Sequence, residues 1–203
     1  MIRVLFIAIL TASIFSGCVS KPKIHPNTSF IKINLPKNIE ESLISHDITL
    51  AINMPTGTAI KSSKITYIDS NNLRKNYAYH RWSNFLTLQI QEFFVHSIAK
   101  TNLVFDVAKA QNRVDPTLIL EIDISEFAQY IDKNENSKVV VSGSMRFLNP
   151  KEKKALFSKT FIYEEKMENL GVNELSLAYD RVFALWLKDT LKIIDNLGES
   201  YAR

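Results

Sequence analysis

The sequence predicts an α/β (α+β) fold, in which a mixed, largely antiparallel sheet is covered by two main amphipathic helices. Several segments alternate apolar and polar residues with a period of two, which is the pattern of half-buried strands. Short polar connections separate the later strands, and such connections favour an antiparallel meander. Two longer segments repeat apolar residues at helical spacing. Helices together with an antiparallel run of strands indicate a sheet with helices packed on it.

The N-terminal segment has a pattern of its own. A positively charged start precedes Val4–Ile14, an almost wholly apolar run that is too short to span a bilayer as a permanent helix. Its flanks fit a secretory signal peptide, in which Phe15, Ser16 and Gly17 are the residues that a peptidase recognises. Directly after them comes Cys18, the only cysteine of the chain.

A cysteine directly after such a site resembles the lipobox of bacterial lipoproteins. There the thiol receives a diacylglycerol, and cleavage leaves the lipidated cysteine as the first residue. The resemblance implies a signal peptide at residues 1–17, a covalent lipid on Cys18 and, since no aspartate follows the cysteine, sorting to the outer membrane. Two alternatives remain: an ordinary cysteine near an ordinary cleavage site, and an uncleaved apolar anchor.

Residues 18–28 are the predicted tether between the lipid and the domain. They are mostly polar and contain Pro22 and Pro26. Ten extended residues reach at most about 35 Å, which is enough to lift a domain off the lipid headgroups. Residues 29–198 then form one predicted domain, without an internal repeat or a second apolar span of transmembrane length.

The composition is that of a globular protein, with 46% hydrophobic and 23% charged residues. The net charge of +4 is spread along the chain and predicts a solvated surface; attraction to anionic lipid or to a partner is the alternative. The chain lacks a basic stripe interleaved with aromatic residues, which argues against nucleic acid as a partner. Once Cys18 carries lipid, no thiol remains for an intrachain disulfide or a cysteine zinc site.

The first half of the domain contains three predicted strands. Ser29–Leu35 alternates apolar and polar residues and ends at Pro36. Asp47–Met54 and Lys64–Ile68 are the other two, and Pro55-Thr56-Gly57 is a turn signal between them.

The first predicted helix runs from Asn84 to about Thr101, with Ser83 as its N-cap. Leu103–Val107 follows it as a short strand. The apolar residues of the helical pattern recur at helical spacing: Trp82, Leu86, Ile90, Phe93, Phe94 and Ile98.

Three strong strands define the predicted meander. Leu118–Ser125 and Lys138–Leu148 alternate on either side of a polar loop at Asp132–Ser137. After a turn at Asn149–Lys153, Leu156–Glu165 alternates again.

The last predicted helix is Glu174–Asn196. Asn173 is positioned to cap its start, Glu174 favours the positive end of the helix dipole, and Gly198 lies where a left-handed C-cap is required.

The motifs of common enzyme classes are absent. The sequence contains no Gly-x-x-x-x-Gly-Lys loop and no Gly-x-Ser-x-Gly elbow. Its four histidines show no metal-ligand spacing: His25, His46, His80 and His96. Glu121 and Asp123 are a candidate carboxylate pair, but alternation on a solvated sheet face explains them fully. We therefore predict no enzyme activity, no metal site and no cofactor other than the lipid on Cys18.

One region is similar to a known family. Ile65-Thr66-Tyr67 is followed by Asn76-Tyr77-Ala78-Tyr79-His80-Arg81-Trp82-Ser83-Asn84-Phe85-Leu86 and then by a helix. A tyrosine-rich strand, an Arg-Trp pair, a small residue and a helix in this order resemble the ABC-transporter auxiliary lipoprotein family, the paraquat-inducible type-C-like lipoproteins. Leu118–Phe127 and Val139–Leu148 resemble the later half of that family, whose variable loop corresponds to Phe127–Asn136. The resemblance covers roughly residues 28–197.

The family resemblance implies two helices on a mixed sheet, in a periplasm-facing accessory subunit of an intermembrane lipid transport system. Such systems combine an ATPase, a permease and an MCE-domain protein that bridges the periplasm. The lipoprotein would dock that bridge at the outer membrane, and ring-like bridges are compatible with a homo-oligomer. A lipoprotein that assembles an outer-membrane machine is the alternative function, and the missing motifs disfavour a periplasmic hydrolase.

Tyr79, Arg81 and Trp82 are the candidate corner between the tyrosine-rich strand and the helix. As a structural corner, Trp82 would pack against the sheet and Arg81 would bond carbonyls or a carboxylate; the alternative is direct contact with a partner. Three phenylalanines lie in or next to the predicted helix: Phe85, Phe93 and Phe94. Packing in the core is the favoured interpretation of these side chains, and lining a lipid groove is the alternative.

Overall fold

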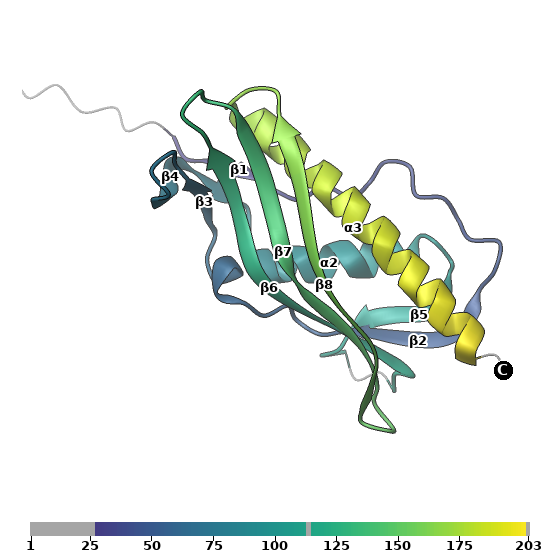
Figure 1. Ribbon diagram of the computed structural model, residues 1–203. Coiled ribbons are helices and arrows are strands. Elements are labelled where there is room, and N and C mark those ends of the chain that lie inside the picture. The colour runs from purple at the N-terminus through teal and green to yellow at the C-terminus, as the bar shows by residue number, and fades with distance from the viewer. Residues whose placement is uncertain (1–26, 113–114, 202–203) are drawn as a thin grey trace, which may run out of the picture.

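The computed structural model describes residues 27–112 and 115–201, and it confirms the predicted fold class. Within these residues an open, mixed sheet of eight strands is accompanied by two helices (Figure 1). In chain order the elements are β1 (Ser29–Ile31), β2 (His46–Ile52), the short 3₁₀ helix η1 (Thr58–Ile60), β3 (Lys64–Ile68), β4 (Arg74–Trp82), α2 (Leu86–Ala99), β5 (Val104–Lys109), β6 (Leu118–Ile131), β7 (Ser137–Asn149), β8 (Lys154–Met167) and α3 (Val172–Tyr201). In the described part of the chain, no helix has both the length and the apolar character needed to cross a membrane.

The long central strand β6 organises the sheet. Its partner β7 is antiparallel along Ile119–Ile131, and β8 is antiparallel to β7, which confirms the predicted meander. On the other edge of β6, β2 pairs in parallel at Leu118–Leu120 and β3 pairs in parallel at Gln129–Tyr130. An isolated bridge between Thr56 and Asp123 lies between these two contacts. One edge of a single strand therefore carries β2 and β3 one after the other.

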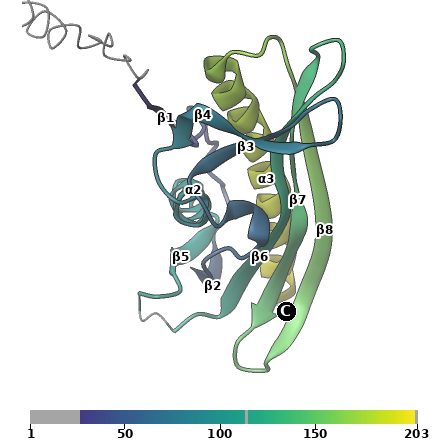
Figure 2. The same ribbon diagram turned by 90° about the vertical axis from the view of Figure 1, so that its left-hand side faces the viewer.

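These two contacts divide the sheet into two wings beside the meander. One wing contains β3, β4 and β1, with β4 antiparallel to β3 and β1 parallel to β4. The other wing contains β2 and β5, which are parallel. Figure 2 shows α2 nearly end-on between the two wings, while α3 runs along the long strands. The parallel pairings make the sheet mixed, and the long ladders are antiparallel.

The core lies between the sheet and the two helices. Trp186 of α3 contacts Phe94 of α2 and Phe161 of β8, with ring centroids 4.8 and 4.6 Å apart. The predicted apolar stripe of the first helix is buried in this core: Leu86, Ile90, Phe93, Phe94 and Ile98. Burial of this stripe contributes the hydrophobic free energy that holds α2 between the wings.

Two boundaries near the N-terminus differ from the prediction. The strand expected at Ser29–Leu35 ends at Ile31, where its pairing with β4 ends. The helix expected to start after Ser83 begins at Leu86, and Phe85 occupies the N-cap position without a side-chain cap. Ser83 is not the N-cap because its N–H donates to the carbonyl of Ile31 at 2.7 Å, which keeps it beside the sheet.

The longest strand also differs from the prediction. A strand ending at Ser125 and a variable loop at Phe127–Asn136 were expected, but β6 continues to Ile131. The register with β7 shifts between Ile124 and Glu126, which marks a bulge. A bulge inserts an extra residue, so the buried face resumes out of phase with the earlier alternation. The predicted end at Ser125 was wrong because the alternation of apolar and polar residues stops at the bulge, whereas the strand continues beyond it.

The last helix begins earlier and ends later than expected. It starts at Val172, so Asn173 is inside the helix and does not cap it, and it continues past Gly198. A Cβ built on Gly198 would lie 2.2 Å from Cγ of His46. The imidazole Nε2 of His46 lies 2.8 Å from a carboxylate oxygen of Asp195. Glycine is therefore required here for the close approach of His46, and the predicted C-cap at this residue is wrong.

This close approach gives a prediction for Gly198→Ala. Alanine is the better helix former by about 1 kcal/mol, yet we expect the substitution to lower the free energy of unfolding by about 1–3 kcal/mol, because the methyl group overlaps the ring of His46. Denaturant unfolding followed by circular dichroism measures it. In a His46→Ala background the same substitution should stabilise the protein, and a gain in stability in the unmodified background would contradict the steric explanation.

Candidate functional site

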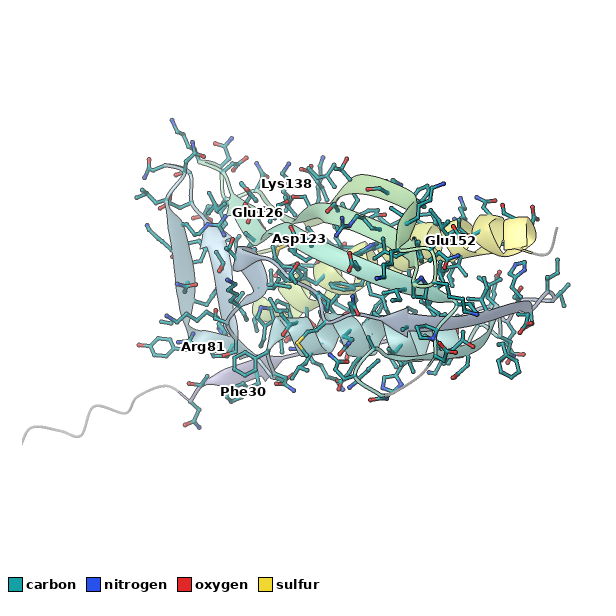
Figure 3. The ribbon with its side chains drawn as sticks, turned by 90° about the horizontal axis from the view of Figure 1, so that it is seen from below. Phe30, Arg81, Asp123, Glu126, Lys138 and Glu152 are labelled. Carbon is teal, nitrogen blue, oxygen red and sulfur yellow. The ribbon has the colours of Figure 1, made fainter. Side chains whose placement is uncertain are left out.

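The predicted site residues lie in two parts of the chain. The residues expected to direct and carry the lipid fall outside the described residues: Phe15, Ser16, Gly17 and Cys18. The candidate corner lies where β4 ends at Trp82, beside β1, the first strand of the domain. Figure 3 labels Phe30 and Arg81 close together at this end of the domain, where its described chain begins. The corner therefore lies at the end of the domain where the predicted tether would join it.

The end of β4 is held between two strands. On one side, Phe30 of β1 is the register partner of Arg81, and Ile31 is the partner of Trp82. On the other side, Lys64 of β3 is opposite Arg81, and the N–H of Trp82 donates to the carbonyl of Ser63 at 2.8 Å. These pairings fix the backbone of the corner from both edges.

Trp82 is a core residue. Its side chain is 2% exposed and makes edge-to-face contacts with Phe127 of β6 and Tyr179 of α3, at centroid distances of 5.7 and 5.2 Å. Phe127 and Tyr179 stack on each other at 4.7 Å. Burial raises the pKa of the Tyr179 hydroxyl above its ordinary value. The corner therefore joins β4 to the central strand and to α3 through aromatic packing.

Arg81 closes a bulge in β4. Lys64 of β3 is opposite Arg81, whereas Thr66, two residues later, is opposite Asn76, so β4 contains extra residues between its two contacts. The guanidinium Nη1 of Arg81 donates to the carbonyls of two residues within this bulge, to Tyr77 and, at 2.8 Å, to His80. We infer that the side chain of Arg81 satisfies carbonyls that the bulge takes out of the ladder.

The same bulge contains a buried polar chain that sequence reasoning missed. The Tyr77 hydroxyl donates to Oε1 of Gln129 at 2.5 Å, and Nε2 of Gln129 donates to the hydroxyl of Ser137 at 2.9 Å. Gln129 is fully buried, and burial raises the pKa of the Tyr77 hydroxyl. Because these groups satisfy one another, they fix β4 against β6 and β7. No sequence spacing connects Tyr77 with Gln129.

Two further residues, also missed, hold the chain just after β1. Oε1 of Gln89 on α2 accepts the N–H of Ile33 at 3.0 Å. Asp180 on α3 accepts the N–H and the side-chain amide of Asn34, at 2.9 and 2.8 Å. Burial raises the pKa of the Asp180 carboxyl, and the hydrogen bonds from Asn34 oppose this rise. We call Gln89 and Asp180 the entry clamp. The sequence does contain one signal for Gln89: it is a polar residue on the apolar stripe of the helix, three residues after Leu86.

The aromatic residues around the corner divide into buried and exposed groups. Phe93 and Phe94 belong to the core, as the core interpretation expects, but that interpretation is wrong for Phe85, which does not join the core. In contrast, the side chains of Phe30, Tyr79 and Phe85 are 65%, 48% and 55% exposed. Tyr79 lies within the bulge of β4, a kind of irregularity that turns a side chain away from the regular sheet direction.

The carboxylates on the outer face of the sheet are paired. Glu121 forms an ion pair with Arg146 at 2.6 Å, and Asp123 accepts the hydroxyl of Thr56 at 2.6 Å. Glu126, labelled with Asp123 in Figure 3, pairs with Arg74 at 2.7 Å. This arrangement is that of a solvated, charge-balanced face, and within the described residues no group of three or more His, Cys, Asp or Glu side chains could hold a metal ion.

Comparison with known proteins gives one family. The model of the ABC-type transport auxiliary lipoprotein component matches residues 52–189, from the last residue of β2 to the middle of α3. The matched segment includes the corner, the bulge and the entry clamp. None of the curated proteins compared with this chain matches it.

Two solved structures share the fold. A Xanthomonas campestris protein of the DUF330 family is 13% identical, with a TM-score of 0.72 over 85% of this chain and 99% of that chain. A crystal structure of an uncharacterised protein is 15% identical, with a TM-score of 0.67 over 83% of this chain and 99% of that chain. Both likenesses extend over nearly the whole of the other protein, so the two wings and the meander form one shared domain.

Proposed function

Because this chain belongs to the family of ABC-type transport auxiliary lipoprotein components, we propose that it is the lipid-anchored accessory subunit of an ABC/MCE-type intermembrane lipid transport system. In this proposal it faces the periplasm and docks the MCE-domain bridge at the outer membrane. The observation that carries the proposal is the family match over residues 52–189, which covers most of the domain. The family consists of transport components and is not a family of enzymes.

The mechanism we propose is tethering, which needs no catalytic group and no cofactor apart from the lipid on Cys18. Stable membrane attachment requires more than one acyl chain, and a mature bacterial lipoprotein carries three. Fixing the domain at one membrane raises its effective concentration near a bridge that reaches that membrane. In support, the corner at the end where the tether would join contains the buried Trp82 and the carbonyl-bonded Arg81, which suits a domain that must hold its orientation at the membrane.

The proposal predicts the partners of the protein in its native membrane. Chemical crosslinking followed by capture of the lipidated protein, with identification by mass spectrometry, should recover an MCE-domain protein together with its permease and ATPase. Cys18→Ala is the control, since without the thiol there is no lipid and the protein should leave the membrane fraction. Recovery of the partners should fall with it.

Two results would contradict parts of this proposal. Recovery of outer-membrane assembly factors without an MCE-domain protein would favour the alternative function, an assembly factor for an outer-membrane machine. Unchanged membrane fractionation of Cys18→Ala would overturn the lipid anchor.

The same experiment tests whether the protein is a homo-oligomer, which a ring-shaped bridge would accommodate. Crosslinks between copies of this protein would identify such an oligomer.

A further inference from the structure

We propose that the domain contacts the bilayer itself, through the exposed aromatic side chains of Phe30, Tyr79 and Phe85, which we call the anchor-end surface. The inference rests on the proposed lipid anchor at Cys18 but not on the identity of the transport partner. It assigns the lipid surface as the ligand of a particular part of the domain.

The three side chains surround the same corner. Phe30 is the register partner of Arg81, Tyr79 precedes Arg81 by two residues, and Phe85 follows it by four. They are 65%, 48% and 55% exposed, although aromatic side chains are usually buried in a globular domain. A single exposed aromatic residue needs no explanation, but several gathered at one place mark a contact surface.

The length and the end of the tether indicate which surface they contact. The predicted tether ends at residue 28, and Phe30 is the second residue of β1. Ten residues reach at most about 35 Å even when fully extended, so a lipid on Cys18 would keep this end of the described domain nearest to the headgroups. The entry clamp then fixes the orientation of the chain where it enters, through Gln89 and Asp180.

The chemistry of the corner suits the headgroup region. Aromatic rings prefer the interface between water and hydrocarbon. Three cationic residues accompany them: Lys32, Lys64 and Arg81. Lys64 is the register partner of Arg81, and none of the three makes an ion pair within the part of the chain that the structure describes. Cations beside exposed rings, with no salt bridge to another described residue, favour a bilayer that contains anionic lipid.

The single cysteine makes a direct test possible. Because Cys18 is consumed by the lipid, Phe30→Cys introduces the one free thiol of the mature protein. The lipidated full-length variant is labelled there with an environment-sensitive fluorophore and placed in vesicles of phosphatidylethanolamine and phosphatidylglycerol with nitroxide-labelled headgroups. Phe105→Cys is the matched control: Phe105 is 75% exposed on β5, at the other end of the sheet.

We expect the fluorophore at residue 30 to be quenched several-fold more than the fluorophore at residue 105, with a blue-shifted emission. A label at Phe85→Cys should behave like the label at residue 30. Equal quenching at residues 30 and 105 in vesicles that carry the protein would overturn the proposal and leave the surface to a protein partner. Failure of the protein to float with the vesicles would instead overturn the anchor on which the inference rests.

Discussion

Replacing Trp186 by alanine is expected to lower the free energy of unfolding by about 3–5 kcal/mol, the range typical of truncating a buried aromatic side chain. The indole is fully buried, and its ring lies 4.8 Å from that of Phe94 and 4.6 Å from that of Phe161. Its removal leaves a cavity where α2, α3 and β8 meet, and dispersion contacts are lost from all three elements. Denaturant unfolding followed by far-ultraviolet circular dichroism measures the change.

Trp186→Phe is the matched control for this substitution. The indole Nε1 has no hydrogen-bond partner among the described residues, so phenylalanine removes a buried N–H without breaking a hydrogen bond. It also keeps most of the ring contacts, and we expect a loss of about 1 kcal/mol or less. If the alanine and phenylalanine variants unfolded at the same denaturant concentration, packing around this ring would not be what holds the two helices to the sheet.

Gly57→Ala is expected to be the most damaging single-methyl change in the described chain, with a loss of about 2–4 kcal/mol or more. Gly57 has φ +125°, a conformation that side chains with a Cβ rarely adopt, and a Cβ would lie 2.0 Å from the carbonyl oxygen of Ile124. The preceding residue, Thr56, exchanges hydrogen bonds of 2.9 Å with the backbone of Ile122 and Ile124. The methyl group would therefore push this bridge away from β6.

Gly171→Ala provides the comparison for Gly57→Ala. A Cβ on Gly171 would meet the side-chain oxygen of Asn169 at 2.7 Å, and a side chain is able to rotate away where the backbone of Ile124 is not. We expect a change below about 1 kcal/mol for Gly171→Ala. Thermal unfolding of both variants measures the difference. Equal melting temperatures would contradict the prediction, because they would show that the segment before η1 can shift away from β6 without loss of stability.

Period-two alternation predicted the meander because its strands are long and one face of each is buried. Lys64–Ile68 was predicted with the bounds that β3 has, and Lys138–Leu148 within one residue of each end of β7. The α2 stripe was likewise predicted, because Ile90, Phe94 and Ile98 leave only one helical face for the core. These patterns are local, so a single segment of sequence contains all the information they need.

The misplaced features depend on contacts that are distant in the chain. Gly198 has the position of a C-cap in the sequence, and only the ring of His46 explains it as a packing residue. Gly143 is similar: its Cβ would lie 2.0 Å from the carbonyl oxygen of Asp123, on the edge of β6 opposite Gly57. Gly57 and Gly143 lie in the segments on either side of β6, next to its bulge in space. Neither glycine is near that bulge in sequence.

The candidate site was predictable only in part for the same reason. The Arg81-Trp82 pair drew attention through the family resemblance, and the structure places Trp82 in the core and Arg81 on backbone carbonyls. The role of Arg81 depends on the bulge, which arises from the register between β3 and β4. The parallel pairing of β1 with β4, which brings Phe30 to the corner, joins segments about fifty residues apart and leaves no local pattern.

The entry clamp has a mechanical consequence for a protein pulled by its N-terminus. Tension applied through the predicted tether would first strain the hydrogen bonds between β1 and β4, because β1 is an edge strand. If β1 detached, the force would next reach Ile33 and Asn34, consecutive residues held by different helices through Gln89 and Asp180. Further unravelling would then require the hydrogen bonds to both helices to break. A pull at this end of the domain would therefore load both helices, which pack in its core, before it reached β2.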